Sequence, residues 1–398
     1  IKPFVGRLLA VQGNLIAYRI SHDPTGEVVR VMETGNMKRQ LIKGFREPIV
    51  DLQWSRHTNL LAVLDTASNL YVYYVNEQCS VSKYVNIIWN DPKDVAAKDG
   101  ADKENLQSVS SARPHLSWCP YTPEEGDPND QCNMIAITKG KTIHIINLTT
   151  LKSAKKDAEL DLATAKDVEG AVLNVSLNDD ISTVCISPDA TAAAIVDVTG
   201  LVSFYIIDSM ELRFAHHWSP PMSLPPKELH FLDNCTAMEQ FWRFCVAGAD
   251  DGHLLGLFEC ENWACVAKLQ IDSALHLNKF DVICDSHARY VYLVDKDGAN
   301  MFCLEVDVSS GQPLFASVTQ ITFSHPIVAI APYDLKDIEI NDSEFCFDEE
   351  EAVRRAEVVV SLIAITPRNV SHLSITLEKT EGRGEQRTGE ATPVRNDQ

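Results

Sequence analysis

The sequence lacks the features that mark a membrane protein or a common hydrolase. In its 398 residues, no apolar run approaches the roughly 20 residues that a membrane helix requires. It has no Gly-x-Ser-x-Gly elbow, no glycine-rich phosphate loop and no His-Glu-x-x-His helix. We therefore expect a chain that neither spans a membrane nor catalyses a reaction, and that uses no cofactor.

Metal-binding signals are also missing. Cys260 and Cys265 have no second pair of ligands at zinc spacing, and the turn at Asp295 lacks the downstream carboxylate of a calcium loop. The adjacent pair His216 and His217 lies in a predicted strand, where neighbouring side chains point to opposite faces, so only one of them could enter any site. We expect no metal site.

Basic residues are scarce. The chain has 35 Lys and Arg against 56 Asp and Glu, a formal net charge of −21, which disfavours polyphosphate over most of the surface. Residues 1–56 are the exception, with nine basic and five acidic residues. This excess is either ordinary solvated charge or a docking surface for an acidic partner. The candidate residues for such a surface are Lys38, Arg39, Lys43 and Arg46.

The cysteines indicate a reducing compartment. Their number, 11, is odd, and several lie inside apolar runs, such as those around Cys185 and Cys284. A free cysteine in such a run behaves as a small buried hydrophobe, whereas secreted domains pair their cysteines. We therefore expect a cytosolic protein.

Long helical periodicity is almost absent, and short apolar runs recur between turns. Four repeats share one pattern: an apolar strand that ends in Asp, a tight polar turn and a second apolar strand. An Asp carboxylate suits this position because it can accept hydrogen bonds from the backbone N–H groups of the turn. The four predicted structural residues are Asp65, Asp197, Asp250 and Asp295.

A further strand precedes each hairpin and another follows it, which predicts blades of four antiparallel strands and an all-β, seven-bladed propeller. We expect one propeller domain over residues 1–380, a disordered tail over 381–398, a mobile loop over 91–112 and an acidic insertion over 334–351. The last blade shows only three clear strands, and Ile1–Val5 is a candidate for its closing strand. The predicted blades are 4–45, 48–90, 113–160, 181–218, 227–270, 276–321 and 325–377.

One aromatic segment has two interpretations. Alternation places Phe241 and Arg243 on one face of a strand and Trp242 and Phe244 on the other. The segment either packs in the core, with Arg243 over an aromatic ring, or contributes Phe241 and Arg243 to a partner-binding hot spot.

The turn aspartates match the position typical of WD repeats, although the Trp-Asp dipeptide is missing. Several segments resemble, in order and spacing, the amino-terminal propeller of the metazoan enhancer-of-decapping scaffold family. They are Leu41–Phe45, Trp118–Glu125, Ser187–Asp189, Phe241–Asp250 and Ser324–Pro326.

This resemblance implies a non-enzymatic scaffold of cytoplasmic mRNA decay in processing bodies. Its partners would be the decapping enzyme and its activators, or other decay and repressor factors, bound through short peptide segments. Family members oligomerise through regions that this chain does not contain. The alternative is direct, weak binding of single-stranded RNA through the basic first blades, which requires the basic candidates to share one face.

Overall fold

The structure is a computed structural model, and every statement below concerns the residues that it describes. Four predictions fall outside them: the closing strand Ile1–Val5, the loop 91–112, the tail 381–398, and the positions of Phe241 and Trp242. The described ranges are 7–22, 26–35, 38–89, 113–121, 133–232, 243–271, 279–285, 287–295, 298–307, 314–340, 355–366 and 369–380.

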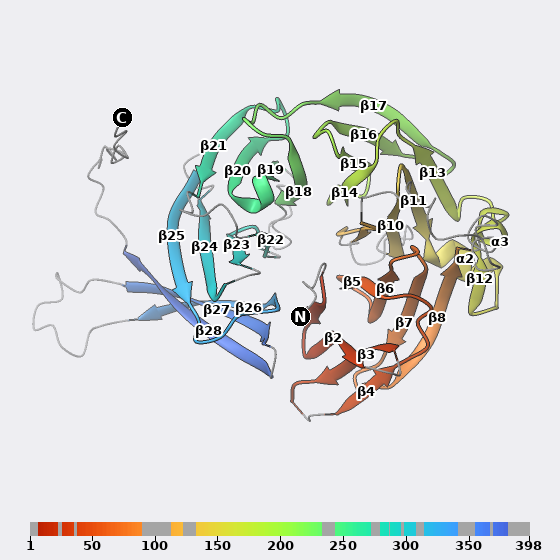
Figure 1. The fold of residues 1–398 in the computed structure, drawn as a ribbon, viewed down its shortest axis with the longest axis horizontal. Coiled ribbons are helices and arrows are strands. Elements are labelled where there is room, and N and C mark those ends of the chain that lie inside the picture. Colours follow the sequence, from red (N-terminus) through yellow and green to blue (C-terminus); the bar gives the residue numbers. More distant parts are fainter. Residues whose placement is uncertain are drawn as a thin grey trace, which may run out of the picture. The chain divides into compact units, whose positions relative to one another are not determined.

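The chain forms seven sheets, six of four or five strands and a last one of three, and confirms the predicted all-β, seven-bladed propeller. Neighbouring strands within a sheet are antiparallel, with one exception described below. In Figure 1 the strands β14, β18 and β22 lie on the inner side of their sheets, and β17, β21 and β25 lie on the outer side.

The first three sheets contain thirteen strands, of which β12 (Glu159–Asp161) is described below with its insertion. The first is β1 (Leu9–Gln12), β2 (Leu15–His22), β3 (Gly26–Glu33) and β4 (Arg39–Ile42). The second contains β5 (Ile49–Trp54), β6 (Leu60–Asp65), β7 (Leu70–Val75) and β8 (Val81–Ile88). The third contains β9 (Leu116–Trp118), β10 (Met134–Lys139), β11 (Thr142–Asn147) and β13 (Val172–Ser176).

The remaining sheets follow the same plan. The fourth is β14 (Ile181–Ile186), β15 (Ala192–Asp197), β16 (Val202–Ile207) and β17 (Leu212–Trp218). The fifth is β18 (Pro226–Leu232), β19 (Phe244–Ala249), β20 (Leu254–Glu259) and β21 (Cys265–Gln270). The sixth is β22 (Phe280–Cys284), β23 (Tyr290–Asp295), β24 (Asn300–Asp307) and β25 (Leu314–Thr322).

The hydrophobic core lies between sheets, because the middle strands are buried on both faces. Alternate residues of β6 belong to two different clusters: Leu61 and Val63 pack with the first sheet, and Ala62 and Leu64 pack with the third. Equivalent clusters join the third sheet to the fourth, the fourth to the fifth and the fifth to the sixth. This arrangement explains why the middle strands are continuous apolar runs without polar alternation.

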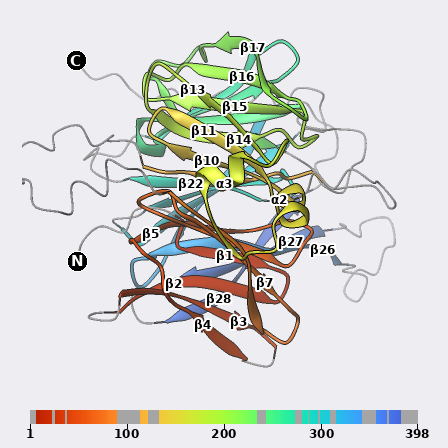
Figure 2. The same cartoon turned by 90° about the vertical axis from the view of Figure 1, so that its right-hand side faces the viewer.

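The third sheet departs from its predicted range, which ended at residue 160. Between β11 and β13 the chain forms α2 (Leu148–Ala154), β12 (Glu159–Asp161) and α3 (Leu162–Lys166). The strand β12 pairs in parallel with β8 and becomes the fifth strand of the second sheet. In Figure 2 the two helices lie in front, on the outer side of the sheets. The fourth strand of this blade is therefore β13, beyond residue 160.

The last sheet contains β26 (Ala329–Ile340), β27 (Arg355–Ile365) and β28 (Val370–Thr380). Residues 334–340, predicted as part of an insertion, are instead the second half of β26. The chain divides into two compact units, residues 1–331 with 363–371, and residues 332–362 with 372–398. These last strands have 11 or 12 residues, longer than the three to nine residues of the other described strands, and most of each lies in the second unit.

The described cysteines are all free thiols, and most are buried. Burial raises the pKa of Cys119 and of Cys303 to about 12, so both stay protonated at neutral pH. No helix in the described ranges is long and apolar enough to cross a bilayer.

The burial of His144 on β11 makes the free energy of unfolding depend on pH. His144 is 4% exposed, its Nδ1 atom has no hydrogen-bond partner among the described residues, and burial lowers its pKa to about 3. In the unfolded chain this histidine takes up a proton near pH 6.5. Between pH 6.5 and 3 the unfolded state therefore binds more protons than the folded state, and the free energy of unfolding falls as the pH falls.

We predict that His144→Leu reduces this pH dependence. Between pH 7 and pH 5 the free energy of unfolding should fall less in the variant than in the wild type, by up to about 2 kcal/mol. Urea unfolding at the two pH values measures the difference. Equal losses in both proteins would contradict the buried, neutral state of this histidine.

Candidate protein-interaction surfaces

The turn aspartates hold the hairpins at the middle of the blades. Asp65 is fully buried and accepts hydrogen bonds from the backbone N–H groups of Ala67 (3.0 Å) and Asn69 (2.9 Å), from the Asn69 side chain and from the Tyr71 hydroxyl. Asp197 accepts from Thr199 and Leu201 N–H groups in the same way. These carboxylates are held by hydrogen bonds within their own turns.

The other two hairpins differ from each other. Asp295 is 1% exposed and accepts the Gly298 N–H at 2.8 Å, and a Cβ on Gly298 would lie 2.3 Å from its Oδ2, so the turn requires glycine. Asp250 is exposed, has a left-handed backbone (φ +53°) and accepts the His253 N–H through its backbone carbonyl.

Sequence reasoning missed a fifth turn aspartate, Asp285, because it follows the first strand of its blade rather than the second. Its buried carboxylate accepts the backbone N–H groups of His287, Arg289 and Tyr290. Desolvation raises its pKa, and these hydrogen bonds oppose the increase.

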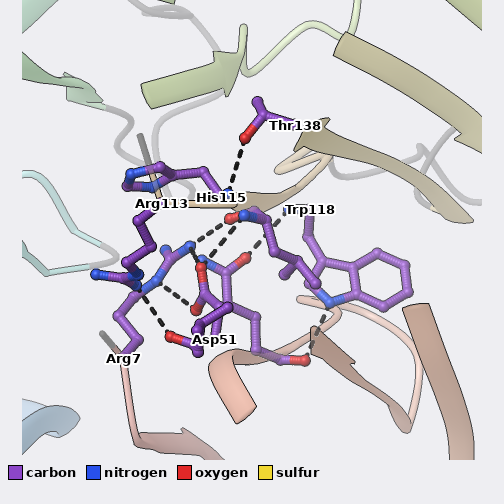
Figure 3. Close-up of polar contacts among 9 residues, drawn as sticks. Arg7, Asp51, Arg113, His115, Trp118 and Thr138 are labelled. Carbon is purple, nitrogen blue, oxygen red and sulfur yellow. Dashed lines mark hydrogen bonds and ion pairs between the residues drawn. The ribbon is translucent and has the colours of Figure 1, made fainter. Parts of the chain in front are cut away.

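A polar cluster joins the start of the chain to the inner strands of the second and third sheets (Figure 3). Arg7 Nε donates to Asp51 Oδ1 at 2.9 Å and Nη2 donates to Oδ2 at 2.7 Å, while the Asp51 side chain is fully buried. Asp51 also accepts the Leu116 N–H at 3.2 Å, and Arg7 donates to the Leu116 carbonyl. One carboxylate therefore ties Arg7, β5 and β9 together.

Arg113 and His115 complete this cluster from the segment before β9. Arg113 Nη2 donates to the Val50 carbonyl at 3.0 Å, and the His115 N–H donates to Thr138 Oγ1 at 2.8 Å. Burial lowers the pKa of Arg113, and the Asp51 carboxylate opposes this. Burial, with the nearby Arg113 charge, lowers the pKa of His115 to about 3. Most of these polar groups bond to backbone groups, and so connect Arg7 and the segment before β9 to the second and third sheets.

The basic candidates lie on separate segments. Lys38 is in the β3–β4 turn, where its carbonyl accepts the Glu33 N–H, and Arg39 is on β4. Lys43 follows the end of β4, and Arg46 lies in the connection to β5. All four are exposed, but Arg46 Nη2 forms an ion pair with Glu159 Oε1 of β12 at 2.8 Å. Arg46 is therefore already neutralised by an acidic group from the inserted strand.

Arg243 precedes β19. Its guanidinium lies 5.0 Å from the centre of the Phe244 ring and 3.3 Å from Glu259 Oε1. Phe244 is 5% exposed and packs between the fifth and sixth sheets. The Arg243 side chain is 44% exposed and can be reached by a partner.

Three exposed apolar side chains lie in the β16–β17 hairpin of the fourth sheet. Ile206 on β16, Met210 in the following turn and Phe214 on β17 are 36%, 57% and 49% exposed. The register pairs Ser203 with His217 and Phe204 with His216. The two histidines therefore point to opposite faces, as the strand alternation predicts.

A comparison with protein families assigns the chain. Residues 1–311 match the family described as the WD40 region of Ge1, enhancer of mRNA-decapping protein. The chain belongs to this Ge1 WD40 family. The match covers most of the first compact unit, and it agrees with the family that the sequence segments indicated.

Curated relatives of this Ge1-family chain carry the same name in distant animals. This chain is 26% identical over 367 residues to enhancer of mRNA-decapping protein 4 of Danio rerio, and 25% identical over 371 residues to that of Homo sapiens. Each alignment covers 88% of this chain and 25% of the relative. The homolog of Drosophila melanogaster is 25% identical over 331 residues, covering 77% of this chain and 23% of the relative. The chain thus spans about a quarter of the length of these relatives.

Solved structures support the fold of the Ge1-family chain. The WD40 domain of Toxoplasma gondii coronin matches with a TM-score of 0.58 at 12% identity, over 94% of this chain and 81% of that one. The β-propeller domain of Cps50 (Swd1) from Myceliophteria thermophila matches with a TM-score of 0.56 at 10% identity, over 94% and 98% of the two chains. These likenesses show the WD40 propeller fold alone.

The Arg7–Asp51 pair generates a stability prediction. Asp51→Ala leaves the Leu116 N–H without its acceptor and removes both Arg7–Asp51 hydrogen bonds, while Arg7, whose side chain is 45% exposed, keeps the Leu116 carbonyl. We therefore expect a loss of about 2 kcal/mol in the free energy of unfolding. Glu159→Gln removes an ion pair whose two side chains are each 49% exposed, and should cost less than about 1 kcal/mol. Urea unfolding measures both. Similar losses in the two variants would show that the polar cluster does not hold these strands.

Proposed function

We propose that this chain is a non-catalytic protein-interaction domain of the mRNA decapping machinery. It acts in the cytoplasm, in processing bodies, where it docks the decapping enzyme, its activators or repressor factors and so promotes removal of the 5′ cap. The match of residues 1–311 to the enhancer-of-decapping family carries this proposal. Regions of the longer relatives that this chain does not contain would provide oligomerisation.

The contacts of the polar residues favour docking over chemistry. The turn carboxylates accept hydrogen bonds from their own turns, and Asp51 is bonded to Arg7 and Leu116. Exposed apolar and aromatic side chains, such as Phe214 on β17 and Val318 on β25, are instead available to a partner, together with Arg243. Aromatic side chains and arginine are the residue types that most often carry binding energy at protein interfaces.

Direct RNA binding is the second candidate function, and the basic first blades are the observation in its favour. The exposed Lys38, Arg39 and Lys43 could contact phosphate, but the ion pair of Arg46 with Glu159 removes one of the four charges. A chain with a net charge of −21 also repels RNA over the rest of its surface.

Affinity capture tests the docking proposal. Purified chain used as bait in cytoplasmic extract should enrich the decapping enzyme or its activators, identified by mass spectrometry, relative to an unrelated WD40 propeller as control bait. A bait that remains folded and enriches none of the decapping proteins would refute the proposal.

RNA binding is tested by fluorescence anisotropy with a single-stranded 20-nucleotide RNA at low salt. We expect no saturable binding, and no difference between the wild type and a variant in which Lys38, Arg39 and Lys43 are all alanine. Binding that falls steeply with salt and disappears in the variant would establish the RNA function instead.

A further inference from the structure

The outer strand β17 is an open sheet edge. Five consecutive residues, 213–217, are exposed, so that the strand presents both of its faces as well as its edge. Phe214 is 49% exposed and makes edge contact with Tyr205 at 5.6 Å and a tilted contact with His217 at 4.6 Å. Half of a large aromatic ring therefore remains in contact with solvent.

Several other described outer strands are protected by charge or by a covering strand, the usual devices against edge pairing. β12 covers part of β8, which also carries Lys83, and β21 carries Lys268 in its centre. β25 is uncharged, but it exposes no aromatic ring comparable to Phe214. β17 combines an open edge with an aromatic anchor.

A rigid aromatic base lies next to this edge, on the face toward the fifth sheet. His216 stacks on Phe204 at 4.7 Å and lies 5.9 Å from Trp263, and Trp263 also contacts Phe204 at 4.6 Å and Trp218 at 4.6 Å. Trp263 has a left-handed backbone with φ +59°, which is strained for a bulky residue. Strain of this kind persists only where the surroundings impose it, and it concentrates at binding sites.

Arg213 is the one side chain of β17 that is charged at neutral pH, whereas the whole chain carries −21. A carboxylate of an acidic partner segment can therefore pair with Arg213, although most of the surface repels such a segment. The neighbouring turn carries Asp208 and Glu211, which confines the favourable region to the strand itself.

We propose that the edge of β17, with Trp263 beside it, captures an extended, acidic segment of a partner protein by strand addition. Backbone hydrogen bonds to the edge would supply affinity, and alternate apolar side chains of the partner would contact the Trp263–His216 face and the Phe214–Tyr205 face. This inference rests on the proposed docking function and names the surface and the chemistry of the segment it binds.

A phage-displayed library of random 16-residue peptides, selected on the purified chain, tests this without knowledge of the natural partner. Enriched peptides should be acidic, with apolar residues at alternate positions.

Phe214→Asp should raise the Kd of a synthesised peptide by about tenfold or more, since aromatic anchors dominate such interfaces. Val318→Asp on β25 is the matched control, because Val318 is 48% exposed, and should leave the Kd within about twofold.

Charge reversal provides a second, independent variant. Arg213→Glu should weaken the acidic peptide, and a peptide with its acidic residues changed to lysine should bind this variant better than the wild type. Thermal unfolding confirms that each variant is folded. The inference is overturned if no peptide is enriched, if enriched peptides are basic, if Phe214→Asp binds as the wild type does, or if Val318→Asp abolishes binding instead.

The same variants separate this inference from the proposed function. If wild-type chain and Phe214→Asp capture the same decapping proteins from extract, β17 is not the docking surface, although the docking function stands. If acidic peptides bind β17 but the wild type captures no decapping protein, the surface stands and the decapping role fails.

Discussion

Burial of the middle strands on both faces, as in the second to fifth sheets, is the constraint on which the rest of this structure depends. The middle strands are apolar on both sides, as in β6, where Leu61 and Leu64 belong to different cores. Such a sheet is stable only between two others, so the blades must follow one another side by side. The interior is used for packing, and binding functions are left to turns, connections and outer strands.

Long-range polar contacts then fix the strands that packing alone does not specify. Asp51, 44 residues from Arg7 in sequence, joins it to the second and third sheets, and Arg46 joins the first connection to the inserted strand β12. A hydrogen bond from the Arg46 N–H to Tyr71, whose hydroxyl donates to Asp65, connects this region to a turn aspartate. Asp65 thus belongs to a wider network as well as to its own hairpin.

The sequence was sufficient for the repeated hairpins, because Asp65 and Asp197 end strands that alternate cleanly with turns. It was insufficient where a segment is too short for periodicity or pairs far away. The three residues of β12 carry no strand pattern of their own, and their parallel pairing with β8 is a tertiary contact. Asp285 occupies an unexpected turn, and the left-handed Trp263 gives no sequence signal. The open edge of β17 depends on neighbours that do not cover it, which composition does not reveal.

Hydrogen–deuterium exchange with and without a purified decapping activator tests the central claim most directly. We expect the backbone amides of the middle strands, such as β6, β15 and β19, to exchange slowly in both states, because both of their faces are buried. The activator should add protection at outer strands or exposed turns only. Middle strands that exchange as fast as the outer strands, or protection by the activator that is confined to the inner strands, would contradict this account.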